Sequence, residues 1–78
     1  MTSVEKRVCS VLETYLYPRK VAIQDRLQIF HLNSLDEIEL KYLLEKAFNT
    51  KISWRSYTGF SSAETTVEEL SRFIEECI

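Results

Sequence analysis

The 78-residue sequence contains a single glycine, Gly59, and a single proline, Pro18. Because these two residue types most often interrupt regular structure, their scarcity favours a chain that is mostly helical. Both lie in stretches without helical periodicity, so we expect two connections between helical segments. The length is that of one small domain, and we expect residues 1–78 to form it.

Other absences bear on the cellular compartment of the protein, on the state of its cysteines and on metal binding. No run approaches the ~18 consecutive apolar residues of a membrane span, and the N-terminus lacks the residue order of a signal peptide. We therefore expect no membrane span and a cytoplasmic location. In that compartment Cys9 and Cys77 should remain reduced and pack as small apolar residues. His31 is the only histidine, so no metal-ligand spacing occurs and we expect no metal site.

Charge and motifs argue against nucleic-acid binding and against catalysis. The formal net charge is -2, and basic residues outnumber acidic ones only in residues 1–30, by five to three. No helix presents a basic face beside a short turn. The sequence also lacks a glycine-rich phosphate loop and a nucleophile paired with a base. We expect neither a nucleic-acid partner nor an enzyme.

Three amphipathic helices are predicted. The first opens at Thr2 and Glu5 and ends before Pro18, and the last opens at Thr66 and Glu69; both pairs have the capping-box spacing. The second runs from Asn33–Ser34 to about Phe48. Residues 16–33 form a long first connection, and residues 51–65 form an irregular segment with at most one short helical turn. The sequence thus predicts an all-α fold, a small three-to-four-helix bundle with a long first connection.

Apolar residues recur at helical spacing on one face of each helix. The positions expected to face the core are Val4, Val8, Val11, Leu12 and Tyr15; Leu40, Leu43, Leu44, Ala47 and Phe48; and Val67, Leu70, Phe73, Ile74, Cys77 and Ile78.

The second helix carries an additional apolar stripe of Leu35, Ile38 and Tyr42 on nearly the opposite side. Two interpretations are open. Loop residues such as Phe30 or Trp54 could cover the stripe as part of the core. Alternatively, the stripe is exposed and docks a partner, with the acidic side chains around it steering a basic surface.

The segment Leu32-Asn33-Ser34-Leu35-Asp36-Glu37-Ile38-Glu39-Leu40 resembles the serine motif of the acyl carrier protein family. That motif is usually written Asp-Ser-Leu-Asp and stands at the start of the family's second helix. The resemblance extends, in order and approximate spacing, to residues 4–8, 40–52 and 65–70. It therefore covers nearly the whole chain.

This resemblance implies a bundle of the acyl carrier protein type and a carrier function. A phosphopantetheinyl transferase would join 4'-phosphopantetheine from coenzyme A to Ser34 through a phosphodiester, and the arm would hold acyl groups as thioesters. Acyl-loading enzymes and acyl-transfer or condensing enzymes would be the other partners of a monomeric, freestanding carrier in fatty acid, lipid or polyketide-type biosynthesis. The residues that match the family's docking positions are Leu35, Asp36, Glu37, Ile38, Glu39 and Tyr42.

A purely structural role for Ser34 is the alternative. Ser34 and Glu37 have the capping-box spacing, so the serine could cap the second helix. Asn33 is an equally good cap, and would leave the Ser34 hydroxyl at the first helical position and free to be modified. If Ser34 is not modified, the chain would be a helical protein-interaction module that uses the Leu35, Ile38 and Tyr42 face.

Three departures from the family pattern suggest a specialised carrier. Asn33 replaces the usual Asp. His31 stands where glycine is common, so we expect any turn that needs positive φ to differ there. The aromatic segment 53–60 has no counterpart, and either closes the interior or forms a contact patch for a dedicated enzyme. Peptidyl carriers share the serine chemistry, but the acidic Asp36, Glu37 and Glu39 favour the acyl type.

Overall fold

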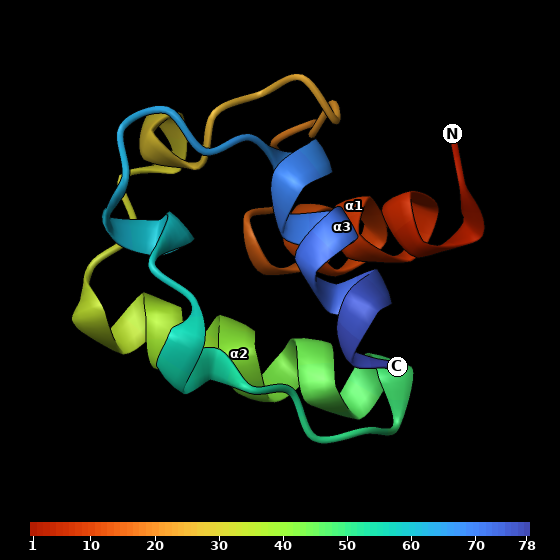
Figure 1. The fold of residues 1–78 in the computed structure, drawn as a ribbon. Helices are drawn as coiled ribbons and strands as arrows, with labels where there is room; N and C mark the ends of the chain where they lie inside the picture. Colours follow the sequence, from red (N-terminus) through yellow and green to blue (C-terminus); the bar gives the residue numbers. More distant parts are fainter.

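A computed structural model describes residues 1–78 and shows three α-helices, α1 (Ser3–Tyr15), α2 (Ser34–Phe48) and α3 (Val67–Cys77) (Figure 1). The first connection contains a four-residue 3-10 helix, η1 (Leu27–Phe30). The chain has no β-strand, only one isolated bridge between Arg26 and Thr66. The predicted all-α bundle with a long first connection is confirmed.

The second connection is more helical than we expected. It contains two 3-10 turns, η2 (Trp54–Ser56) and η3 (Gly59–Ser61), where at most one short turn was predicted. The prediction was wrong because these turns have no helical periodicity. They form where the aromatic side chains of this segment pack against the core.

Side-chain caps fix the starts of α1 and α3. The Thr2 hydroxyl accepts the Glu5 amide at 3.1 Å, and the Thr66 hydroxyl accepts the Glu69 amide at 3.2 Å. Each glutamate in turn accepts the backbone N–H of its threonine. These reciprocal bonds satisfy amides that have no partner in the first helical turn. Both predicted capping boxes are confirmed.

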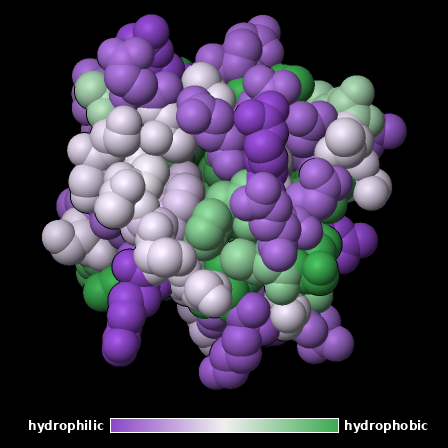
Figure 2. Space-filling view, viewed as in Figure 1, coloured by the Kyte–Doolittle hydropathy of each residue, from purple (hydrophilic) through white to green (hydrophobic).

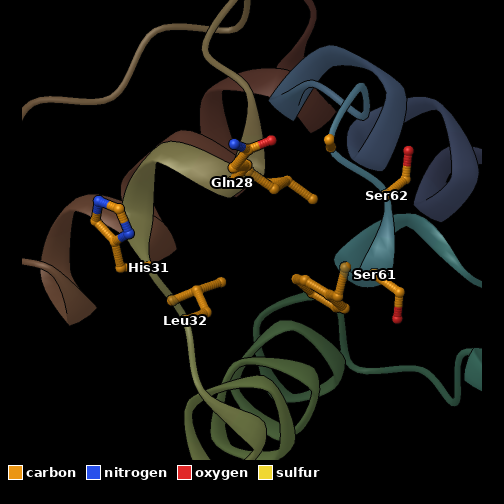
Figure 3. A pocket seen from close by; sticks show the side chains of 8 residues that line it. Gln28, His31, Leu32, Ser61 and Ser62 are labelled. Atoms are coloured by element: carbon orange, nitrogen blue, oxygen red, sulfur yellow. The ribbon is translucent and has the colours of Figure 1, made fainter.

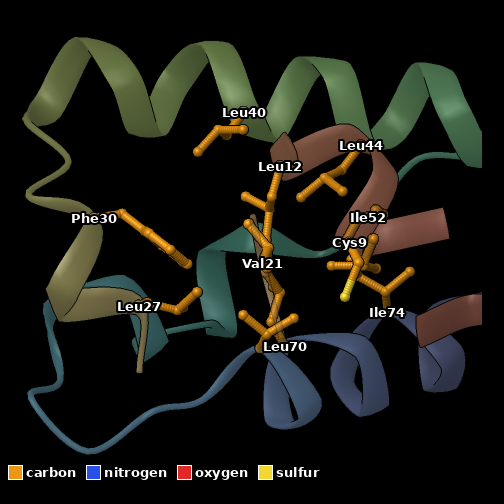
Figure 4. Close-up of a cluster of buried hydrophobic side chains, with 12 residues drawn as sticks. Cys9, Leu12, Val21, Leu27, Phe30, Leu40, Leu44, Ile52, Leu70 and Ile74 are labelled. Atoms are coloured by element: carbon orange, nitrogen blue, oxygen red, sulfur yellow. The ribbon is translucent and has the colours of Figure 1, made fainter. Parts of the chain in front are cut away.

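Helix α1 packs against both α2 and α3. In Figure 4 the side chains of Leu40 and Leu44 point from α2 toward Leu12, Leu70 and Ile74, with residues of the first connection filling one end. These five side chains are fully buried. The hydrophobic core comprises Val8, Cys9, Leu12, Val21, Leu27, Phe30, Leu40, Leu44, Ile52, Val67, Leu70 and Ile74.

The core prediction was wrong for Leu43 and Ala47, which are half-buried and lie outside the core cluster, and for Ile78, whose side chain is 58% exposed. Helix α3 ends at Cys77, so the helical spacing that would turn Ile78 toward the core stops one residue earlier. Cys9 is buried, Cys77 is half-buried, and both are free thiols.

Carboxylates hold the two connections against the helices. Glu13 accepts the Val21 amide at 2.9 Å, and Glu45 accepts the Ile52 amide at 3.0 Å. Because each bond joins a helix to a loop next to a buried residue, these acids anchor the loops that complete the core.

The turn before α2 retains positive φ although it lacks glycine. His31 has φ 53° and ψ 47°, the left-handed conformation. Our expectation that this turn would differ was wrong, because histidine is one of the non-glycine residues that adopt the left-handed conformation more readily, at a cost of about 1–2 kcal/mol. The turn lets the chain leave η1 and start α2 three residues later.

None of the helices combines the length and the apolar character needed to cross a membrane. In the space-filling view of Figure 2, hydrophobic residues reach the surface in patches that hydrophilic side chains interrupt.

Candidate functional site

Ser34 is the first residue of α2, and the structure decides which residue caps that helix. The Asn33 side chain accepts the Asp36 amide at 2.8 Å, and the Asp36 carboxylate accepts the Asn33 amide at 3.1 Å. The capping box is therefore formed by Asn33 and Asp36. The interpretation of Ser34 as the helix cap is wrong: its side chain is exposed, and its hydroxyl makes no hydrogen bond.

The backbone around Ser34 suits an attached phosphate. The amides of Ser34 and Leu35 precede the first intrahelical bonds and have no acceptor within the protein, whereas the Glu37 amide donates to the Asn33 carbonyl at 3.0 Å. Free amides and the positive end of the helix dipole favour a negative group at this position.

A hydrogen bond from α1 fixes the residue two positions after Ser34. The Tyr15 hydroxyl donates to Asp36 Oδ1 at 2.8 Å, while Asp36 Oδ2 accepts the Asn33 amide. This bond to Asp36, followed by desolvation and the negative charges of Asp36 and Glu39, raises the pKa of Tyr15 to about 12. Sequence periodicity assigned Tyr15 to the core stripe and missed this contact. The one available signal was a hydroxyl at the end of an otherwise aliphatic stripe.

We expect Tyr15→Phe to lower the urea midpoint of unfolding at pH 7. The folded pKa of Tyr15 lies above its unfolded value, so its contribution is complete below pH ~10 and disappears as pH rises through about 12. The stability difference between wild type and Tyr15→Phe should therefore shrink across that window. Tyr17→Phe is the matched control, because Tyr17 is exposed and its hydroxyl makes no hydrogen bond. Equal midpoints for the two variants would show that the bond to Asp36 does not stabilise the fold.

The second apolar stripe of α2 lies on the surface. Leu35, Ile38 and Tyr42 are exposed by 63%, 63% and 61%. The interpretation that loop residues cover them is wrong, because Phe30 is buried in the core and Trp54 packs with other aromatic residues beside α3. The three side chains thus form a continuous exposed face of α2, which we call the α2 face.

Acidic residues border the α2 face. Glu39 is exposed and Glu37 is half-buried. Asp36 differs from them because both of its oxygens already accept internal hydrogen bonds. Its charge therefore contributes to the field around Ser34, while Glu37 and Glu39 are freer to pair with a partner. The docking role of all six residues stays a prediction.

No family model, curated protein or solved structure matches this chain.

A groove opens beside the start of α2, between η1 and η3. It encloses about 350 Å³ and is lined by Leu27, Gln28, His31, Leu32, Phe60, Ser61, Ser62 and Ala63. Figure 3 shows Gln28, His31 and Leu32 on one wall and Ser61 and Ser62 on the other. Sequence reasoning missed this groove because its walls are about 30 residues apart and neither has a periodic pattern. His31 and Leu32 place it within three residues of Ser34.

No group of three or more His, Cys, Asp or Glu side chains converges in a way that could hold a metal ion.

Proposed function

We propose that this protein is a carrier of the acyl carrier protein type, and that Ser34 is the attachment point of a 4'-phosphopantetheine arm. The observation that supports this most is the state of the Ser34 hydroxyl. It is exposed, makes no hydrogen bond, and stands at the first position of a helix that another residue caps.

The residues around Ser34 fit the group. In the attachment step the Ser34 oxygen forms a bond to the phosphorus nearest the pantetheine of coenzyme A. The pyrophosphate P–O bond breaks and adenosine 3',5'-bisphosphate leaves, while the transferase takes up the hydroxyl proton. The free amides of Ser34 and Leu35 would then donate hydrogen bonds to the phosphodiester. When attached, the arm supplies a terminal thiol that holds acyl groups as thioesters.

The α2 face supports the same proposal. It begins one residue after Ser34, so an enzyme that binds Leu35, Ile38 and Tyr42 has the attachment point within reach. Apolar side chains at the centre of a contact supply most of the affinity, and the charges around them set orientation and association rate. We propose that the phosphopantetheinyl transferase and the acyl-loading, acyl-transfer or condensing enzymes all use this face of a monomeric carrier.

Intact mass spectrometry tests the attachment. After incubation with coenzyme A, Mg²⁺ and a broad-specificity phosphopantetheinyl transferase, we expect the mass to increase by one arm. Ser34→Ala should abolish the increase. Ser3→Ala is the matched control, since Ser3 is also exposed and also stands first in a helix, after the capping residue Thr2. This control should be modified as wild type is.

A helical protein-interaction module that is never modified is the second candidate. The exposure of the α2 face supports it equally, because docking through that face does not require chemistry at Ser34. A chain that gains no mass with several transferases of different specificity would favour this module and contradict the carrier proposal.

A further inference from the structure

We propose that the groove between η1 and η3, together with two unpaired donors in the aromatic cluster that includes Phe60, binds a short acyl cargo that carries a hydrogen-bond acceptor in addition to its thioester. This inference rests on the proposed carrier function and specifies its cargo. It places a hydroxyacyl or ketoacyl group at the site and excludes a long aliphatic chain.

The position and chemistry of the groove favour a short polar cargo. It lies within three residues of Ser34, and its volume of about 350 Å³ falls at the lower end of the range for small-molecule sites. Gln28, His31, Ser61 and Ser62 contribute polar groups to both walls. A long alkyl chain would desolvate these groups without replacing their hydrogen bonds, which is unfavourable. A short polar group would replace those hydrogen bonds and so avoid this cost.

The packed interior disfavours a long aliphatic cargo. None of the four cavities of the protein is lined by more than one residue of the hydrophobic core. Between the second connection and α3, the space is occupied by a cluster of Trp54, Tyr57, Phe60 and Phe73, with ring centroids 4.6 to 6.2 Å apart. An aliphatic chain would have to displace these rings to enter the core.

Two hydrogen-bond donors in that cluster lack an acceptor. Trp54 Nε1 and the Tyr57 hydroxyl are buried and have no hydrogen-bond partner within the protein. Burial raises the pKa of Tyr57, so its hydroxyl keeps its proton and can donate. Buried donors without acceptors destabilise a fold, and natural proteins rarely retain them without a reason.

Phe60 connects the donors to the groove. Phe60 lines the groove. The centroid of its ring lies 5.4 Å from the ring centroid of Tyr57 and 6.2 Å from that of Trp54. Gly59, the residue before it, lies against the Tyr57 phenol, where a Cβ would overlap that side chain. Phe60 is therefore the residue shared by the groove and the aromatic cluster that contains both donors.

The test compares two cargoes of equal carbon number. The arm is loaded from butyryl-coenzyme A or from 3-hydroxybutyryl-coenzyme A, and intact mass first establishes that loading is complete. Trp54 is the only tryptophan, so its indole N–H gives one resonance in an ¹H–¹⁵N spectrum. We expect the hydroxylated cargo to shift that resonance and the amides of Gln28 and Ser62, and butyryl to leave them near the positions of the unacylated arm. 3-Oxobutyryl should act as the hydroxylated cargo does.

Three results would contradict this inference. The first is equal shifts from the two four-carbon cargoes. The second is shifts confined to the neighbours of Ser34. The third is an octanoyl cargo that perturbs Leu44 and Leu70 more than the hydroxylated cargo perturbs the groove. A fully loaded protein with any of these results contradicts the cargo site alone, whereas a protein that accepts no arm contradicts the carrier function as well.

A stability measurement on the protein without an arm gives an independent check. Tyr57→Phe removes an unpaired buried hydroxyl, so we expect it to raise the urea midpoint of unfolding. Tyr42→Phe is the control, because the Tyr42 side chain is exposed, and it should leave the midpoint unchanged. A lower midpoint for Tyr57→Phe would show that the hydroxyl already has an acceptor and would overturn its assignment to cargo.

Discussion

Leu40→Ala is expected to remove most of the stability of this fold. Leu40 is fully buried in α2, where it faces α1 across the core (Figure 4). Truncating a buried leucine to alanine costs about 2–5 kcal/mol, because transfer free energy is lost and a cavity remains. A domain of this size typically has only about 3–5 kcal/mol of net stability, so a large fraction of the variant should be unfolded at 25 °C.

Urea unfolding followed by far-ultraviolet circular dichroism measures this effect. Ile38→Ala is the matched control, since Ile38 lies in the same helix and is largely exposed. Surface substitutions of this kind change stability by about 0.5 kcal/mol or less. Similar midpoints for Leu40→Ala and Ile38→Ala would contradict the assignment of the two faces of α2.

Ile38→Arg is expected to leave the fold intact and to slow attachment of the arm. Ile38 lies at the centre of the α2 face, between Leu35 and Tyr42. A residue that anchors a protein contact contributes about 2 kcal/mol or more, and a basic side chain would also repel a basic partner. We therefore expect kcat/KM of the phosphopantetheinyl transferase to fall about 10- to 100-fold.

Two controls separate docking from net charge. Ile38→Leu keeps the apolar contact and should react at nearly the wild-type rate. Thr14→Arg adds the same charge at an exposed position of α1 and should also have little effect. If Ile38→Arg is modified as fast as Thr14→Arg, the transferase does not bind through the α2 face.

The two effects follow from the same helix having two different apolar faces. Leu40 and Leu44 hold α2 in the bundle, while Leu35, Ile38 and Tyr42 are not required for that packing. A fold of 78 residues has few apolar side chains available for its core, so an exposed apolar face of this kind calls for a function. The proposed carrier role provides one.

The helix boundaries could be predicted from sequence because they depend on local interactions. Thr2 and Glu5, and Thr66 and Glu69, are three residues apart, and each pair satisfies its own helix start without help from the rest of the chain. The core positions on α1 and α2 follow for a similar reason, since helical spacing alone places Val8 and Leu12 on one face.

The cap of α2 could not be settled in this way. Two caps were compatible with the sequence, Ser34 in a capping box with Glu37, and Asn33. In the folded protein, Tyr15 donates a hydrogen bond to Asp36 from 21 residues away, and Asp36 closes the box with Asn33. The hydrogen bond from Tyr15 therefore holds the Asp36 side chain that caps α2 together with Asn33. The Ser34 hydroxyl takes no part in this cap and stays free.

The amino-acid sequence alone determined where α1 and α3 begin, which helix faces are apolar and which serine lies in a segment that resembles a carrier motif. Tertiary structure decided that the α2 face is uncovered, that Trp54 Nε1 and the Tyr57 hydroxyl are buried without acceptors, and that a polar groove opens beside Ser34. The groove brings together segments of both connections, residues 27–32 and 60–63. Contacts between segments so far apart arise only when the core is packed, and no local spacing encodes them.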